Sequence, residues 1–138
     1  MPAKDIYHDT VRRALIKDGW AITHDPLRLQ VGLRRMFVDL GAEKLLAAEK
    51  GEQKIAVEIK SFVSKSEMAD LEDALGQYVL YKKVLAKKEP ERKVFLAIRK
   101  SVYVSVFEDE LGKLVLEGGD ICLIVFDEVT EEIVQWIN

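Results

Sequence analysis

The chain has 138 residues, enough for one domain with a sizeable core, and its 49% apolar and 33% charged residues are ordinary for a globular protein. No apolar run approaches the roughly 18–20 residues that cross a bilayer, and residues 1–9 lack the apolar segment of a secretory signal, so we expect a cytoplasmic protein with no membrane partner. The net charge of −3 argues against tight independent binding to nucleic acid, because neutralisation of phosphates drives that affinity.

The first half of the chain predicts one helix followed by strands. Apolar residues at helical spacing predict a helix over residues 5–18. Residues 20–22 begin an extended piece that Asp25-Pro26 ends. The β-branched and aromatic content of residues 34–48 predicts a strand. A turn at 49–53 and a second strand at 54–60 complete a β-hairpin.

In the second half of the chain, segments with helical periodicity alternate with segments of strand character. Ser64-Lys65-Ser66-Glu67 has the pattern of a capping box and predicts a long helix to about Lys88. Residues 93–98 read as a strand. Residues 101–117 show strand-like alternation at Val102, Val104 and Val106 but also a helical apolar stripe. We favour the helix, because a crossover must precede the next strand.

The last segments complete the predicted fold. Residues 121–126 form an apolar strand, and the lone Cys122 within it predicts a buried thiol in a reducing compartment. Residues 132–137 fit either a final strand or a short terminal helix. The order α–β–β–β–α–β–α–β predicts a single α/β domain over residues 1–138, with a central mixed sheet flanked by helices.

The run Ile55–Phe62 carries two charges inside an otherwise apolar strand. Residues i and i+2 of a strand point to the same face, so Glu58 and Lys60 project side by side while Val57 and Ile59 point into a core. An unpaired buried charge is costly, so charges in this position call for an explanation.

A second carboxylate, Asp39, lies in the apolar run of residues 36–42, on the preceding strand. Adjacent strands lie about 4.8 Å apart, near enough for Asp39 and Glu58 to share one cation. Two acids and a lysine are the parts of a Mg²⁺- or Mn²⁺-dependent phosphodiesterase site. We expect the Ile59 carbonyl oxygen as a third ligand, and Lys60 to orient a metal-bound water or stabilise the charge on phosphorus.

The pattern Glu-x-Lys alone is weak, since it occurs three times. Glu52–Lys54 and Glu91–Lys93 lie in or beside turn-like segments, where ordinary surface charge explains them. Glu58–Lys60 is the one pair that lies well inside an apolar strand. Context therefore selects one pair of the three.

The helix that follows supplies a further candidate. Gln77 and Tyr81 are four residues apart and share one helix face, and Gln77 could hydrogen-bond a metal-bound water or a DNA phosphate. The alternative is that Tyr78 and Tyr81 are core aromatics and Gln77 is an ordinary surface residue. With the upstream acids in order, the two readings are about equally good.

Other charged groups carry weaker signals. His8 and His24 lack the cysteine partners and the spacing of a zinc site. Glu43 and Glu49 share strand parity with Asp39 and could join a metal site if the strand runs straight, although solvated charge is the simpler explanation. Basic clusters, Arg34-Arg35 among them, could form local positive strips on the acidic chain; solvated faces are the plain alternative.

Asp39, Glu58 and Lys60, followed by Gln77 and Tyr81 on a helix, together resemble the PD-(D/E)XK nuclease superfamily. The Gln-x-x-x-Tyr pattern resembles its RecB-like branch, and the hairpin with Val-Asp-Leu-Gly-Ala and Val-Glu-Ile-Lys-Ser resembles archaeal Holliday-junction resolvases. The resemblance implies a restriction-endonuclease-like fold and catalytic roles for Asp39, Glu58, Lys60 and Gln77. Two features depart from the pattern: Val38 stands in place of the proline, and His8 or Asp9 stands where the resolvases carry an acid.

A closer resemblance covers nearly the whole chain. Met-Pro-Ala-Lys-Asp-Ile-Tyr-His-Asp-Thr-Val, Gly-Trp-Ala-Ile-Thr-His-Asp-Pro-Leu, Val-Asp-Leu-Gly-Ala-Glu-Lys-Leu-Leu-Ala-Ala-Glu-Lys and Ala-Leu-Gly-Gln-Tyr look like the XisH family. That family is cyanobacterial and is named for control of excision of the fdxN element. The resemblance implies a role in programmed DNA excision, with a small XisI-like partner protein and a site-specific recombinase as partners.

Two functions follow as hypotheses. The first is a Mg²⁺-dependent DNA endonuclease, supported by the intact Asp39, Glu58 and Lys60. The second is a non-catalytic accessory factor that binds DNA or protein and regulates a recombinase, supported by the acidic net charge. A toxin–antitoxin-like pair with the small partner is a third, weaker option. A homodimer is compatible with either of the first two.

Overall fold

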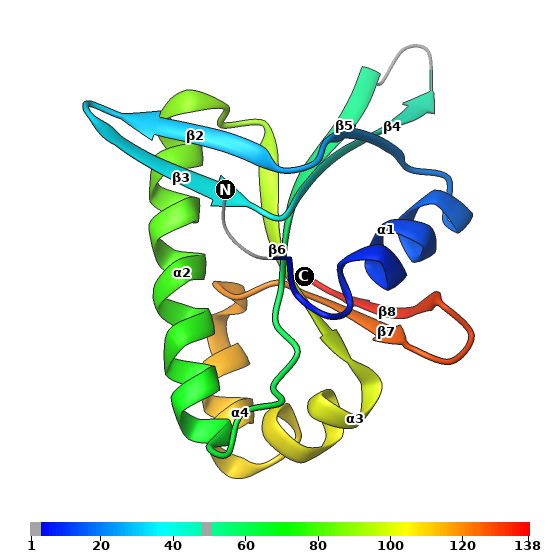
Figure 1. The fold of residues 1–138 in the computed structure, drawn as a ribbon, viewed down its shortest axis with the longest axis vertical. Coiled ribbons are helices and arrows are strands. Elements are labelled where there is room, and N and C mark those ends of the chain that lie inside the picture. Colours follow the sequence, from blue (N-terminus) through cyan, green and yellow to red (C-terminus); the bar gives the residue numbers. More distant parts are fainter. Residues whose placement is uncertain (1–3, 48–50) are drawn as a thin grey trace.

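A six-stranded mixed sheet forms the centre of the molecule (Figure 1), which a computed structural model describes for residues 4–47 and 51–138. Its strands, in spatial order, are β1 (Ala21–His24), β4 (Leu40–Ala47), β5 (Gly51–Ile59), β6 (Arg92–Arg99), β7 (Leu123–Asp127) and β8 (Glu132–Ile137). The pairs β5–β6 and β6–β7 are parallel, and the three outer pairs are antiparallel. The predicted mixed sheet flanked by helices is confirmed.

Helices cover both faces of this sheet. Figure 1 shows α1 (His8–Lys17) on one side and α2 (Glu67–Lys88) on the other. Side chains of β6 alternate between the two cores: Val94, Leu96 and Ile98 pack in the cluster with α2, whereas Phe95 and Ala97 pack in the cluster with α1. Burial on both faces explains why the sequence of β6 is almost continuously apolar.

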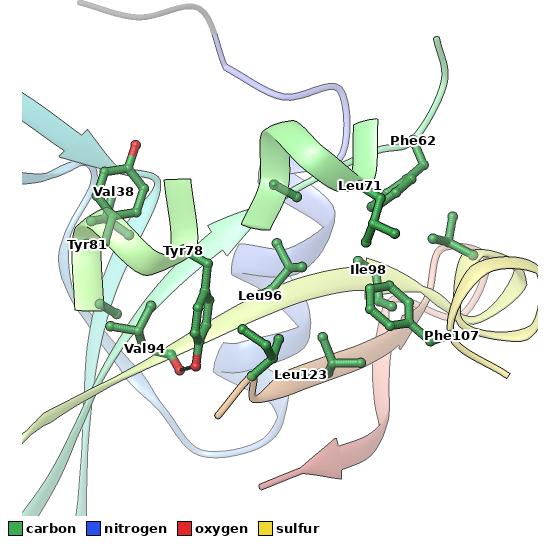
Figure 2. Close-up of a cluster of buried hydrophobic side chains, with 14 of the residues drawn as sticks. Val38, Phe62, Leu71, Tyr78, Tyr81, Val94, Leu96, Ile98, Phe107 and Leu123 are labelled. Atoms are coloured by element: carbon green, nitrogen blue, oxygen red, sulfur yellow. Dashed lines mark hydrogen bonds between the residues drawn. The ribbon is translucent and has the colours of Figure 1, made fainter. Parts of the chain in front are cut away.

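Tyr78 fixes α2 to the sheet. Its hydroxyl group donates to the Val94 carbonyl oxygen and accepts from the Cys122 N–H, both at 3.0 Å. Figure 2 shows this ring inside the α2 cluster, with Val38 and Tyr81 at one end of the cluster. Cys122 is buried, as the sequence predicted.

The crossover between β6 and β7 is helical, as favoured over a strand. It is broken into α3 (Lys100–Val102), a π-helical turn η1 (Tyr103–Phe107), α4 (Glu110–Leu116) and a short 3₁₀ turn η2 (Glu117–Gly119). The break follows from Asp109, which begins α4 by accepting a hydrogen bond from the Gly112 N–H. The open choice for the last segment is settled, because β8 is a strand antiparallel to β7.

The single strand predicted over 34–48 is wrong. The chain forms β3 (Arg34–Val38), breaks at Asp39 and continues as β4. A strand that was not predicted, β2 (Leu27–Val31), pairs with β3 to form a separate two-stranded sheet. The break coincides with Asp39, because its carboxylate binds a backbone N–H of β5 and its own N–H binds a side chain.

Two smaller boundaries also differ. Ser66, not Ser64, caps α2, because the Ser66 hydroxyl oxygen accepts from the Ala69 N–H at 3.0 Å. The second strand of the hairpin begins at Gly51 rather than 54, within the segment predicted as a turn. Residues 48–50, Glu49 among them, lie outside the described residues.

Candidate functional site

The C-terminal end of β5 presents the charged pair on the face that α2 covers. Ala56 packs in the α2 cluster, and Glu58 and Lys60 share its strand parity. Val57 and Ile59 point the other way and are buried in the cluster with α1. Glu58 itself is buried, with 6% of its surface exposed, so this carboxylate lies in the interior.

Asp39 lies beside Glu58 because of the register between β4 and β5. Leu40 pairs with Val57, which brings the preceding residue, Asp39, opposite Glu58. The Asp39 N–H donates to Glu58 Oε1 at 3.3 Å, and the Ile59 N–H donates to Asp39 Oδ2 at 2.7 Å. The structure therefore brings the two carboxylates together.

The electrostatics of this pair are unfavourable. Burial and the neighbouring Asp39 carboxylate raise the pKa of Glu58 to about 9, although Lys60 opposes the rise. Burial also raises the pKa of Asp39, while the hydrogen bond from the Ile59 N–H lowers it. Two carboxyl groups in one desolvated place share a proton more readily than they carry two negative charges.

Lys60 forms an ion pair with a third acid, Asp73 of α2. Its ammonium donates to the Asp73 carboxylate at 2.5 Å, and Asp73 lies one turn before Gln77 on α2. Residues four apart share a helix face, so Asp73, Gln77 and Tyr81 form one stripe along α2. The stripe faces the acid pair, since Glu58 and Asp39 are among the charges that raise the pKa of Tyr81.

Gln77 is half-buried on this stripe, and Tyr81 is buried in the core cluster. Tyr81 is a core aromatic, as the alternative interpretation predicted, and it also borders the acid pair. The role of Gln77 toward a metal-bound water or a phosphate stays a prediction. The same holds for the Ile59 carbonyl oxygen, since the contact seen at Ile59 is made by its N–H group.

Comparison with known proteins matches almost the whole chain to one family. The family model described as XisH protein matches residues 1–134. This chain belongs to the XisH family. A search of curated proteins gives no match.

Two solved structures of XisH relatives support the fold. One is described as an XisH family protein from Nostoc punctiforme; it is 36% identical, and the match covers 97% of this chain and 100% of that one, with a TM-score of 0.87. The other is described as an fdxN element excision controlling factor protein from Anabaena variabilis, with 38% identity, 98% and 100% coverage and a TM-score of 0.87.

Sequence reasoning missed several polar neighbours of the acid pair in this XisH chain. Asp5 accepts from the Ser61 N–H at 3.1 Å through one oxygen and from the Tyr7 N–H through the other. Asp5 raises the pKa of Asp39, and His8 lowers it. Asp5 is the first residue of the helix predicted over residues 5–18, but α1 begins at His8, and no motif in the sequence singles out Asp5 as a site residue.

His8 is buried and bound to an acid. Its Nε2 lies 2.6 Å from Asp25 Oδ1, and Asp25 also pairs with Arg12. The other ring nitrogen, Nδ1, is buried without a hydrogen-bond partner among the described residues. Asp9 is the other candidate for the acidic position of the resolvases, and no hydrogen bond or ion pair within residues 4–47 and 51–138 ties its side chain to this cluster.

The donors present suit a hard divalent cation rather than zinc. Carboxylate and carbonyl oxygens are what Mg²⁺ and Mn²⁺ prefer, and Mg²⁺ keeps several waters when few protein ligands are available. Asp39 and Glu58 are two such ligands; within residues 4–47 and 51–138 no group of three or more His, Cys, Asp or Glu side chains gathers as a metal site. Glu43 does not join them, because it pairs with Arg92.

In the described part of the XisH chain, no helix is both long and apolar enough to cross a membrane.

Proposed function

We propose that this XisH protein has a PD-(D/E)XK nuclease fold and hydrolyses DNA phosphodiester bonds with a divalent metal ion during excision of a DNA element. The observation that carries the proposal is the juxtaposition of the Asp39 and Glu58 carboxylates, with Lys60 two residues along the same strand face. Like charges buried together are costly, and a bound cation would offset that cost.

Asp39, Glu58 and the Ile59 carbonyl oxygen would hold Mg²⁺ or Mn²⁺. The metal would supply a water of lowered pKa and neutralise charge on the scissile phosphate. Lys60 follows Glu58 on the same face and contacts Asp73; released from that pair, its ammonium group could orient the nucleophilic water or bind the negative charge that develops on phosphate oxygens. Gln77, on the stripe that also carries Asp73, can donate its amide to the same water or to a phosphate.

The biological setting of the proposal comes from the relatives. One of the two similar structures is described as an fdxN element excision controlling factor. We infer that this chain acts on DNA in a comparable excision, together with a small XisI-like partner and a site-specific recombinase. The net charge of −3 supports a partner that helps to hold DNA, because an acidic protein gains little from phosphate neutralisation overall.

A cleavage assay with Lys60→Ala tests the enzyme directly. Duplex, flap, junction and single-stranded DNA are incubated with Mg²⁺ or Mn²⁺, with and without the small partner. Loss of a group that stabilises the transition state costs about 10²–10³-fold in rate, while DNA binding stays nearly unchanged. Lys54→Ala is the matched control, since Lys54 belongs to a Glu-x-Lys pair that lies away from Asp39 and pairs with Glu91.

The second candidate is an accessory factor without catalysis. It is favoured by the ion pair between Lys60 and Asp73, which occupies the ammonium group that a nuclease needs free. In that case no metal-dependent product forms on any of the DNA substrates with the partner present. Lys60→Ala then changes only DNA binding or excision frequency.

A further inference from the structure

The β2–β3 ribbon, residues 26–38, is one of two basic parts of the chain; the other is the C-terminal part of α2, with Lys82, Lys83, Lys87 and Lys88. The ribbon contains Arg28, Arg34 and Arg35 and no acidic residue, which gives +3 over thirteen residues. The whole chain has a net charge of −3, so the other residues together carry −6 (−3 minus +3). The ribbon is therefore a positively charged element of an acidic protein, as is the end of α2.

The ribbon is anchored at its base and free at its tip. Leu27, Leu29 and Val38 are buried in the cluster with α2, and Met36 packs against it. Toward the turn the burial ends, and the turn projects past α2 (Figure 1). Leu33, at the tip, is 99% exposed, which has no explanation within the described core.

The arginines are available to a ligand. Arg28 pairs across the ribbon with Phe37, and Arg35 with Gln30, so these four side chains share the outer face. Arg34 lies on the opposite face beside the tip. All three arginines are exposed, and none forms an ion pair or side-chain hydrogen bond with a described residue.

The base of the ribbon adjoins the proposed metal site, because Val38, the last residue of β3, is followed by Asp39. Five strand residues from Arg34 to Val38 span about 17 Å. Phosphates of one DNA strand are spaced by about 3.4 Å along the duplex axis. A ribbon laid along the duplex axis would place its charged tip about five nucleotides from a phosphate held at Asp39.

We propose that the β2–β3 ribbon is a duplex-DNA binding arm that places the substrate on the Asp39–Glu58 site. This inference rests on the proposed function and adds the surface that binds the substrate. Arg28, Arg34 and Arg35 contact backbone phosphates, and Leu33 makes the apolar contact at the groove. The major groove is wide enough for a two-stranded ribbon, and an exposed leucine can pack on bases or sugars there.

Duplex DNA fits this surface better than an acidic protein does. Arg28 and Arg35 on one face, with Arg34 on the other face beside the tip and no carboxylate between them, suit the phosphates that line a groove, whereas protein partners present mixed charges. The ribbon is also continuous in the chain with the residue that would contact the scissile phosphate through the metal.

The test is a salt titration of duplex binding with the full chain. Fluorescence anisotropy of a labelled 30-base-pair duplex in EDTA measures binding without cleavage. Each lost phosphate contact lowers the salt slope by about 0.9, so R28Q/R34Q/R35Q lowers the slope of log K against log salt by about 2.7. Between 50 and 200 mM salt, the wild type then loses about 40-fold more affinity than the variant does.

The matched control is K65Q/K83Q/K113Q, which makes the same charge change at exposed lysines outside the ribbon. It should retain most of the wild-type slope. Leu33→Ala should weaken binding at every salt concentration and leave the slope unchanged, whereas Val129→Ala, at another exposed apolar residue, should have no effect.

Equal losses in the two triple variants, or no binding by the wild type at low salt, would overturn the ribbon as the DNA arm. The failure of the proposed catalysis looks different: binding through the ribbon persists in EDTA, while Mg²⁺ or Mn²⁺ yields no product. Conversely, metal-dependent cleavage that survives in R28Q/R34Q/R35Q with an unchanged substrate affinity overturns the ribbon alone.

Discussion

The Arg92 cluster and the Asp39–Glu58 pair both take charge into the central sheet, but only the first is balanced, in the sense that each of its carboxylates contacts a cation. The Arg92 guanidinium, buried beside the start of β6, binds Glu89, Glu43 and the Ile55 carbonyl oxygen. At the end of β5, two carboxyl groups face each other, and the nearby Lys60 is held by Asp73.

The two clusters shift carboxyl groups in opposite directions. The hydrogen bond from Arg92 lowers the pKa of Glu89, whereas burial and Asp39 raise the pKa of Glu58. A balanced cluster stabilises the fold. A cluster in which two buried carboxyl groups face each other is costly to the fold when they ionise, and this cost is what a bound cation can offset.

The largest effect is expected when the balanced cluster is broken. Arg92→Met leaves a buried carbonyl and two carboxylates without their partner, and removal of one member of a buried ion pair costs about 3–5 kcal/mol. Urea denaturation measures the loss. Glu91→Gln, next in the chain and exposed, is the control and should stay within about 0.5 kcal/mol of the wild type. A cost for Arg92→Met below about 1 kcal/mol would show that the cluster is not what holds this end of the sheet.

Glu58→Gln should have the opposite sign, because at pH 8 the unfolded Glu58 is ionised and folding must bind a proton to it, a cost that glutamine does not have. At pH 8 the free energy of unfolding of the variant should exceed that of the wild type. A gain of about 1 kcal/mol would raise the thermal midpoint by about 2–8 °C. Lower stability of the variant at pH 8 would mean that the ionised Glu58 carboxylate is a stabilising group.

The pH dependence follows from the same shift. The folded pKa of Glu58, about 9, lies above its ordinary value of 4.5, so the folded state binds the proton more tightly. Its contribution to stability is therefore complete below pH 4.5 and is lost as the pH rises toward 9. Thermal melts from pH 5 to 9 should show this decline in the wild type and a shallower one in Glu58→Gln. Parallel curves would contradict the raised pKa.

The smallest effect on stability is expected at Asp73. Its side chain is 60% exposed, and an exposed ion pair contributes about 0–1 kcal/mol. Asp73→Asn should thus barely change the unfolding midpoint, but it frees Lys60 and should raise the rate of metal-dependent DNA cleavage. An unchanged cleavage rate would indicate that the ion pair with Asp73 does not restrain Lys60.

The sequence allowed the inner part of the site to be predicted. Glu58 and Lys60 were identified because strand alternation separates them from Val57 and Ile59, and this local rule needs no tertiary information. Asp39 followed from the hairpin. His8 came up as a candidate only through the resemblance to the resolvases. Asp5 and Asp73 could not be found this way, since they reach the site only through the packing of the N-terminal segment and α2 on the sheet.

The ribbon shows where local patterns fail for the fold. Residues 34–47 have continuous strand character, so nothing in their composition marks the break at Asp39. The break depends on a hydrogen bond from Ile59, twenty residues later. The sheet order, the helical crossover and the parallel pairing of β5 with β6 were within reach, because they follow from element order and length.

Calorimetric titration with Mn²⁺ tests the central claim that the Asp39–Glu58 pair is a cation site, in which a bound metal ion offsets the repulsion between the two carboxylates. At pH 7.5, below the pKa of about 9, binding should release about one proton per ion, measured from the heats in two buffers of different ionisation enthalpy. Glu58→Ala and Asp39→Ala should abolish the heat, and Glu91→Gln should retain it. Equal heats for the wild type and Glu58→Ala would contradict the account.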